Sequence, residues 1–432
     1  MQHPLFCLVR SVHCRGNRFF KIGFLAACAV LANLTSVKAG YDVIHHFGGF
    51  ADGRHPAGGV VATGSSLYGV TGDGGPFNGG VVYKGNLDGS GFTFVHAFSI
   101  APDTARFPLP VGPLVLSGPT LFGVTTAGGA NHNGSVFRVD TDGSGFSDLH
   151  SFATSNDGVD PSPGLVQSGS TLYGVTSEGG SPSGNQGTIF RLSADGTGYQ
   201  ILHNFVGGSG DGSYPDGRLI QSGSTLYGVT RWGGSTNSGT LFKINTDGSG
   251  FAVLHSFGVG GQSPRGALHQ VGNTLYGAAS GGGDFNGGVI FSIQTDGTGY
   301  TKLHSFKAAD DGSGPQGDLL QRGAKLYGTA FDGGAANLGT LFRMNLDGTE
   351  FNVLHSFAGG SSDGAYPSGL SLIDSTLYGT TSEGGSLGVG VLFAFAVPEP
   401  SSLTLGAAGA LVLACWTSKR QARAFRSNRL AA

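Results

Sequence analysis

Seven histidines recur at one equivalent position of a repeated segment, mostly within Leu-His-Ser-Phe. They are His45, His96, His150, His203, His255, His304 and His355. Imidazole nitrogens bind metals and exchange protons near neutral pH, so a ring of seven suggests a metal site or a proton relay. However, the histidines fall on the last strand of each repeat, which we expect at the perimeter, too far apart to share one ion. The sequence therefore predicts structural histidines, each hydrogen-bonded to backbone or to a neighbouring serine.

Acidic side chains offer a second chemistry. Eight aspartates fall in the longer loops, namely Asp73, Asp157, Asp160, Asp211, Asp216, Asp310, Asp311 and Asp363. Carboxylates gathered around one point bind calcium, but no repeat supplies the spaced carboxylates of an EF-hand loop. Aspartate before glycine is also an ordinary turn former. We expect no metal site and no cofactor, with calcium as the alternative.

These residues belong to a repeat of about 51 residues. Its marker is Leu-Tyr/Phe-Gly, with the aromatic at Tyr68, Phe122, Tyr173, Tyr227, Tyr276, Tyr327 and Tyr378. A period near 50 is typical of solenoids and propellers. One unit contains the runs 219–221 (LIQ), 225–230 (TLYGVT), 240–245 (TLFKIN) and 251–257 (FAVLHSF). Short β-branched and aromatic runs between glycine turns predict four antiparallel strands per unit.

The two ends of the array are offset by one strand. Residues 41–47 (YDVIHHF) match a fourth strand and precede the first unit, whereas the last unit stops at Val397 without one. A closed ring gains from this offset, because the first strand completes the last sheet and leaves no open edge. The sequence therefore predicts an all-β, seven-bladed propeller of four-stranded blades over residues 40–396, closed by its N-terminal strand.

Strand order predicts two different faces. The turns between strands 1 and 2 and between strands 3 and 4 are short and uniform. The loops between strands 2 and 3 and the blade-to-blade connections vary, as in residues 101–112, 153–164 and 207–217, and we call their side the variable face. Binding residues gather on variable loops held by a rigid scaffold.

The candidate binding residues on the variable face are Tyr214, Arg231, Trp232, Phe331 and Tyr366. An exposed tryptophan stacks on a sugar ring, and the others would surround it. The alternative for Trp232 is that it fills space between two blades.

Catalysis would require residues that break the repeat symmetry. Glycoside hydrolysis usually requires two opposed carboxylates. Between residues 40 and 396 the glutamates are Glu178, Glu350 and Glu383, and two of these are repeat equivalents. No HExxH zinc motif occurs. We expect no catalytic residues and no enzyme; the alternative is a secreted propeller-fold polysaccharide lyase or glycoside hydrolase.

Composition and charge restrict the partners. Glycine supplies 81 of 432 residues without a period of three, which excludes collagen. Residues 40–396 hold 14 basic and 26 acidic side chains, a net charge of −12. This charge repels phosphate backbones, so we expect no nucleic-acid binding. The four cysteines, Cys7, Cys14, Cys28 and Cys415, all lie in the terminal segments, so the repeats hold no disulfide.

The N-terminal residues 1–39 have the order of a secretory signal peptide. A basic stretch precedes the apolar run 22–34, and Val37-Lys38-Ala39 offers a small-x-small cleavage site. The alternative is a lipoprotein box, LAAC, ending at Cys28.

The C-terminal residues 397–432 combine three elements: the motif Val397, Pro398, Glu399 and Pro400, an apolar helix over 403–416, and a basic tail over 419–429. Positive residues stay cytoplasmic, which would place the repeats outside the membrane. This order resembles the PEP-CTERM sorting signal of Gram-negative bacteria. The resemblance implies a transient membrane helix, processing by an exosortase near residues 398–400, and association with extracellular polysaccharide.

The repeat itself resembles the Gloeo/Verruco-type tandem repeat of exported bacterial proteins, through LYG-V/T-T, Gly-Gly, DG-T/S-G-F/Y and LHSF. Its Gly-Gly after the second strand is also similar to kelch blades. Neither resemblance implies a reaction. The expected function is an exported, surface-associated, non-enzymatic scaffold that binds or organises extracellular polysaccharide or envelope proteins.

Overall fold

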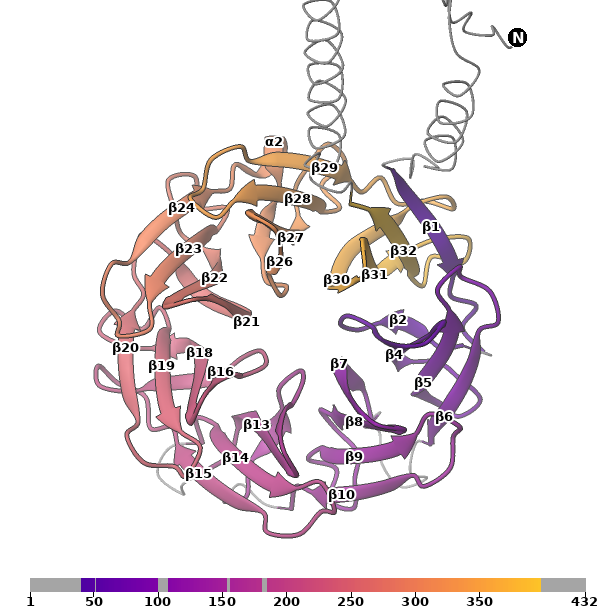
Figure 1. The fold of residues 1–432 in the computed structure, drawn as a ribbon, viewed down its shortest axis with the longest axis horizontal. Helices are drawn as coiled ribbons and strands as arrows, with labels where there is room; N and C mark the ends of the chain where they lie inside the picture. The colour runs from indigo at the N-terminus through magenta and orange to yellow at the C-terminus, as the bar shows by residue number, and fades with distance from the viewer. Residues whose placement is uncertain (1–39, 51, 100–107, 154–155, 181–184, 398–432) are drawn as a thin grey trace, which may run out of the picture. The chain divides into compact units, whose positions relative to one another are not determined.

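The computed structural model describes residues 40–50, 52–99, 108–153, 156–180 and 185–397. These residues form seven small antiparallel sheets arranged around an axis (Figure 1). The predicted all-β, seven-bladed propeller is thereby confirmed. The segments predicted as signal peptide and apolar C-terminal helix lie outside the described residues. Within the described ranges, no helix is long and apolar enough to cross a membrane.

Strands are numbered along the chain, and each blade runs from the axis outward. Blade 1 contains β2 (Arg54–Pro56), β3 (Val61–Thr63), β4 (Ser66–Asp73), β5 (Asn78–Asn86) and β6 (Thr93–Ser99). Blade 2 contains β7 (Pro110–Ser117), β8 (Thr120–Thr125), β9 (Ser135–Asp140) and β10 (Ser147–Ser151). Blade 3 contains β11 (Val159–Pro161), β12 (Val166–Ser168), β13 (Thr171–Glu178), β14 (Thr188–Ser193) and β15 (Gln200–Asn204). Blade 4 contains β16 (Gly212–Pro215), β17 (Ile220–Ser222), β18 (Thr225–Gly233), β19 (Thr240–Asn245) and β20 (Ala252–Ser256).

The remaining three blades follow the same plan. Blade 5 contains β21 (Gln262–Val271), β22 (Thr274–Gly281), β23 (Val289–Gln294) and β24 (Thr301–Ser305). Blade 6 contains the short helix α2 (Ala308–Asp311) in its entry loop, then β25 (Ser313–Pro315), β26 (Leu320–Arg322), β27 (Lys325–Asp332), β28 (Thr340–Asn345) and β29 (Asn352–Ser356). Blade 7 contains β30 (Gly364–Ile373), β31 (Thr376–Gly384), β32 (Val391–Ala396) and β1 (Tyr41–His46).

The first described strand closes the ring. β1 is the outermost strand of blade 7 and pairs antiparallel with β32, with Tyr41 opposite Phe395 and Val43 opposite Phe393. Figure 1 shows the indigo β1 beside the yellow β32. The predicted closure is therefore confirmed, and blade 7 gains a paired outer strand in place of an open edge.

In four blades the innermost strand is divided into two short strands that pair with the same neighbour. The sequence analysis predicted only the second of these two strands, such as residues 219–221 in blade 4. In blade 4, Pro215 ends β16, and Gly217 follows with a φ of 83°. A Cβ on Gly217 would lie 2.5 Å from the carbonyl oxygen of Gly266 in blade 5. Only glycine allows the blades to approach so closely around the axis. The bend directs the residues beside it, Asp216 and Arg218, to the central channel.

The glycine of Leu-Tyr-Gly has a packing role in every blade. In blade 4, a Cβ on Gly228 would lie 2.6 Å from the ring of Phe242 on the next strand. The end of the aromatic ring thus occupies the space that a Cβ on the glycine would need. The apolar core lies between adjacent blades: Tyr227 of blade 4, for example, belongs to one buried cluster with Leu268 and Phe291 of blade 5. Burial of these side chains stabilises each blade against its neighbours.

Candidate functional site

The seven repeated histidines lie on the outermost strands or, for blade 7, on β1. Each imidazole stacks on an aromatic ring of the next blade, with ring centroids 3.6–4.2 Å apart. The pairs are His45–Phe92, His96–Phe146, His150–Tyr199, His203–Phe251, His255–Tyr300, His304–Phe351 and His355–Tyr41. The ring of histidines therefore joins blade to blade at the perimeter.

Five of these histidines also contact an aspartate seven or eight residues further along. The Nε2–carboxylate pairs are His45–Asp52 (2.6 Å), His150–Asp157 (3.1 Å), His203–Asp211 (3.3 Å), His304–Asp311 (2.9 Å) and His355–Asp363 (3.0 Å). Each carboxylate also accepts a backbone N–H from the connection to the next blade. The hydrogen-bond partner is thus a carboxylate, not the backbone or serine that the sequence analysis expected. The recurring spacing from His to Asp-Gly was the signal that could have identified it.

Two of these carboxylates, Asp157 and Asp363, have a pKa below the usual value of an aspartate. Burial alone would raise the pKa of Asp363, but hydrogen bonds from His355 and the Ala358 amide outweigh it and bring the pKa to about 2. His255 has Gln262 at the corresponding aspartate position, and burial lowers the pKa of its imidazole. Across the described ranges, no three His, Cys, Asp or Glu side chains converge as metal ligands.

The structure brings together only some of the predicted binding residues. Phe331 of blade 6 and Tyr366 of blade 7 have ring centroids 5.1 Å apart. Trp232 is the penultimate residue of β18 in blade 4 and lies opposite Ser213, with 40% of its surface exposed. Tyr214 follows Ser213 on β16 and is half-buried. Its N–H donates to the carbonyl of Gln186. The candidates therefore form two sites, one on blade 4 and one between blades 6 and 7.

Further apolar side chains are exposed on the variable face. Phe50, Phe77 and Leu387 lie in loops at the junction of blades 7 and 1 and are 74%, 58% and 63% exposed. Val259 and Phe285 of blade 5 are also exposed. The sequence analysis did not include them among its candidate binding residues.

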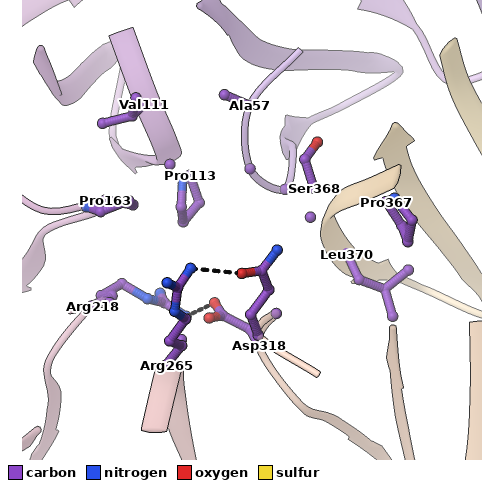
Figure 2. Close-up of a pocket in the computed structure, with 18 of the residues that line it drawn as sticks. Ala57, Val111, Pro113, Pro163, Arg218, Arg265, Asp318, Pro367, Ser368 and Leu370 are labelled. Atoms are coloured by element: carbon purple, nitrogen blue, oxygen red, sulfur yellow. Dashed lines mark hydrogen bonds and ion pairs between the residues drawn. The ribbon is translucent and has the colours of Figure 1, made fainter. Parts of the chain in front are cut away.

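The central channel holds a cluster of charged side chains that the sequence analysis also missed. A cavity of about 270 Å³ lies among the bends of the innermost strands (Figure 2). Arg218 Nη2 donates to Asp318 Oδ2 at 3.1 Å, and Arg265 Nη1 donates to Gln316 Oε1 at 2.9 Å. The first of these bonds links blade 4 to blade 6, past blade 5. Asp318 Oδ1 also accepts the N–H of Ala267 at 2.8 Å.

Arg231, predicted as a binding residue, is connected to this cluster. Its Nε and that of Arg265 each lie 3.7 Å from Asp216 Oδ2. Burial raises the pKa of Asp216, and the two guanidiniums oppose that shift. The buried Nε atoms of Arg218, Arg231 and Arg265 have no hydrogen-bond partner. The only sequence signal for this cluster was the Pro-x-Gly bend, in which Asp216, Arg265 and Gln316 are the middle residue and after which Arg218 and Asp318 follow the glycine.

The fold and the site together define a closed seven-bladed propeller with one uniform face, one variable face and a charged central channel. The profile of the Gloeobacter/Verrucomicrobia repeat matches residues 23–231 and 183–393. The chain therefore belongs to the Gloeobacter/Verrucomicrobia repeat family. No curated protein matches it in sequence.

Solved propeller structures resemble the chain in fold. An oligogalacturonate lyase in complex with manganese is 14% identical, with a TM-score of 0.52 over 84% of this chain and 97% of the lyase. An oligogalacturonate lyase from Vibrio parahaemolyticus is 13% identical, with a TM-score of 0.52 over 84% and 95%. The extracellular domain of a putative one-component system from B. thetaiotaomicron is 8% identical, with a TM-score of 0.53 over 82% and 40%. At these identities the similarity concerns the fold alone.

Proposed function

We propose that this protein is an exported, surface-associated propeller that binds extracellular polysaccharide or envelope proteins through its variable face, without catalysing a reaction. The observation that carries this proposal is the set of exposed aromatic and apolar side chains on that face, Trp232 above all. Aromatic faces stack on the apolar faces of sugar rings, and aromatic residues are enriched at protein interfaces.

The opposite face offers little for recognition. Its Asp-Gly turns repeat almost unchanged, and the aspartate of each turn is satisfied locally: Asp247 Oδ1, for example, accepts both the N–H and the Oγ–H of Ser249. Gly248 in the same turn lies against Leu202 of the preceding blade. These contacts support a structural role for the uniform face and a binding role for the variable one.

The charged groups support a non-enzymatic role. Asp318 is paired with Arg218, Glu350 is paired with Lys325, and the loop carboxylates of five blades are paired with histidines. The alternative is a propeller-fold polysaccharide lyase or glycoside hydrolase, whose carboxylates would have to be released from these partners to act on a substrate.

Export is proposed from the two chain ends. Residues 1–39 would direct secretion, with lipidation at Cys28 as the alternative, and residues 397–432 would direct exosortase processing. Val397 supports a functional boundary here: it is buried, its N–H donates to the carbonyl of Ser375, and its carbonyl accepts from Arg322. The propeller thus holds the chain up to the first residue of the proposed sorting motif.

The experiment that tests binding compares two exposed aromatic residues. The full-length protein is applied to an array of neutral and acidic bacterial polysaccharides and to envelope-protein extracts. Trp232→Ala should weaken binding about tenfold, which corresponds to about 1.4 kcal/mol. Phe94→Ala should not, because Phe94 is similarly exposed but lies on the outer wall of blade 1.

The same samples distinguish binding from turnover. We expect no new reducing or unsaturated sugar ends after incubation with any bound polysaccharide. Release of such ends would favour the lyase or hydrolase, and binding that is equal in the wild type and Trp232→Ala would refute the proposed site.

A further inference from the structure

The charged cluster beside the cavity holds more positive than negative side chains, whereas the four that line the cavity itself are balanced. Arg218 and Arg265 line the cavity, and Arg231 lies behind Asp216, so three guanidiniums share two carboxylates, those of Asp216 and Asp318. This excess of positive charge contrasts with the net charge of −12 on residues 40–396. A bound anion would compensate it.

The arginines also retain unused donors. Each guanidinium offers five N–H donors. The hydrogen bonds to Asp318 and Gln316 use one donor each of Arg218 and Arg265. Both side chains are about one-third exposed, at 36% and 28%, so a ligand in the cavity can reach them. Arginine pairs favourably with planar carboxylates because its donors form a fork of matching geometry.

The rest of the cavity wall is mostly apolar. In Figure 2, Ala57, Val111, Pro113 and Leu370 line the cavity away from the charged side chains, together with the hydroxyl-bearing Ser368. Phe331, from the variable-face end of β27, also lines the cavity, and its ring contacts that of Tyr366. A ligand that fits must therefore combine an anionic group with a flat, partly apolar body.

We infer that the central channel binds the carboxylate of a single hexuronate residue, either free or at the end of an acidic polysaccharide. The choice of a sugar acid rests on the proposed function. Arg218 and Arg265 would bind the carboxylate, and the proline, leucine and aromatic wall would contact the C–H face of the ring. A cavity of about 270 Å³ is at the lower limit for small-molecule sites, which suits one sugar residue. The negative net charge of the propeller would repel an extended polyanion. The end of an acidic chain, which places one carboxylate in the channel, is therefore the more favourable ligand.

The test is calorimetric titration of the full-length protein with D-glucuronate and D-galacturonate, with D-glucose and glutarate as comparison ligands. We expect a hexuronate to bind, glucose and glutarate to bind at least tenfold more weakly, and added salt to weaken hexuronate binding. Arg218→Gln and Arg265→Gln should each weaken binding at least tenfold. Arg343→Gln is the matched control, because Arg343 also has a buried, unpartnered Nε but lies on β28, outside the cavity lining.

The result can be separated from failure to fold and from failure of the proposed function. Thermal unfolding identifies a variant that does not fold. If Arg218→Gln does not fold, the binding measured with Arg265→Gln alone decides the test. No hexuronate binding, or binding unchanged in folded arginine variants, overturns the inference. If hexuronate does not bind but the variable face still binds polysaccharide, the channel site is refuted and the proposed function is not. Glutarate binding as tight as hexuronate binding overturns the sugar assignment.

Discussion

The phenol ring of Tyr41 stacks on the imidazole of His355, with ring centroids 3.6 Å apart and planes within 7°. Tyr41 comes from the start of the propeller, whereas His355 lies on β29, near its end. The same histidine–aromatic stack joins all the other adjacent blades, so the contact at the seam is equivalent to the others. The N-terminal strand therefore completes blade 7 both by strand pairing and by this side-chain contact.

Replacing Tyr41 tests whether the seam contributes to stability. Tyr41→Ala removes the stack on His355 and ring contacts with Phe357 and Phe393, and should lower the free energy of unfolding by about 2–4 kcal/mol. Urea unfolding measures the change. Phe351→Ala, which removes the equivalent stack on His304, should have a similar effect. A loss in Phe351→Ala but not in Tyr41→Ala would show that the seam is not part of the cooperative structure.

The glycine of Leu-Tyr-Gly should not tolerate a side chain. Gly228→Ala places a Cβ 2.6 Å from the ring of Phe242 and should lower the free energy of unfolding by about 1–3 kcal/mol. Gly210→Ala is the control, because a Cβ there meets no atom within 4 Å. Equal stability of both variants, measured by thermal unfolding, would contradict the packing described for this motif.

Acid should destabilise the propeller in two steps. The folded pKa of His255 lies below its unfolded value of about 6.5, so the unfolded state binds more protons and stability falls as the pH drops below that value. The folded pKa of Asp363 is about 2, against about 3.9 unfolded. Its contribution is complete above about pH 4 and is lost as the pH falls toward 2.

Unfolding free energies measured from pH 8 to pH 2 separate the two steps. His255→Gln should reduce the slope just below pH 6.5, and Asp363→Asn should reduce the slope below pH 4. Slopes identical to that of the wild type in both variants would mean that these groups titrate alike in the folded and unfolded states.

The proposed sorting signal can be tested by protein chemistry. In a Gram-negative host that carries an exosortase, Pro398→Ala with Pro400→Ala should leave residues 401–432 attached, whereas Arg423→Ala should retain cleavage if the motif itself is recognised. Mass spectrometry of the terminal peptides measures both outcomes. A start at Gly40 would support the ordinary signal peptide, and a lipidated Cys28 would support the alternative. Cleavage unaffected by the proline substitutions would rule out the motif.

The repeat period and the offset of the terminal strands were enough to predict the fold. Equivalent histidines at a fixed place in each unit also identified the strand they occupy. Their partners were harder to predict, because stacking on Tyr41 or Phe92 involves the next blade, which no pattern within one unit reveals.

The charged cluster of the channel could not be predicted from local sequence patterns either, because its residues come from different blades. Arg218 and Asp318 are 100 residues apart and meet only because two bends from blades 4 and 6 approach the same axis. Phe331 and Tyr366 could be named by residue type, but their contact depends on the geometry of neighbouring blades. Three-dimensional closure, more than residue type, determines which side chains share a site.

Hydrogen–deuterium exchange of the full-length protein, with and without its tightest-binding polysaccharide from the array, tests the binding face most directly. We predict slower exchange in variable-face peptides, such as residues 207–217 and 231–239, and unchanged exchange in the Asp-Gly turns at 195–198 and 247–250. Protection confined to those turns, or no protection anywhere, would contradict a binding role for the variable face.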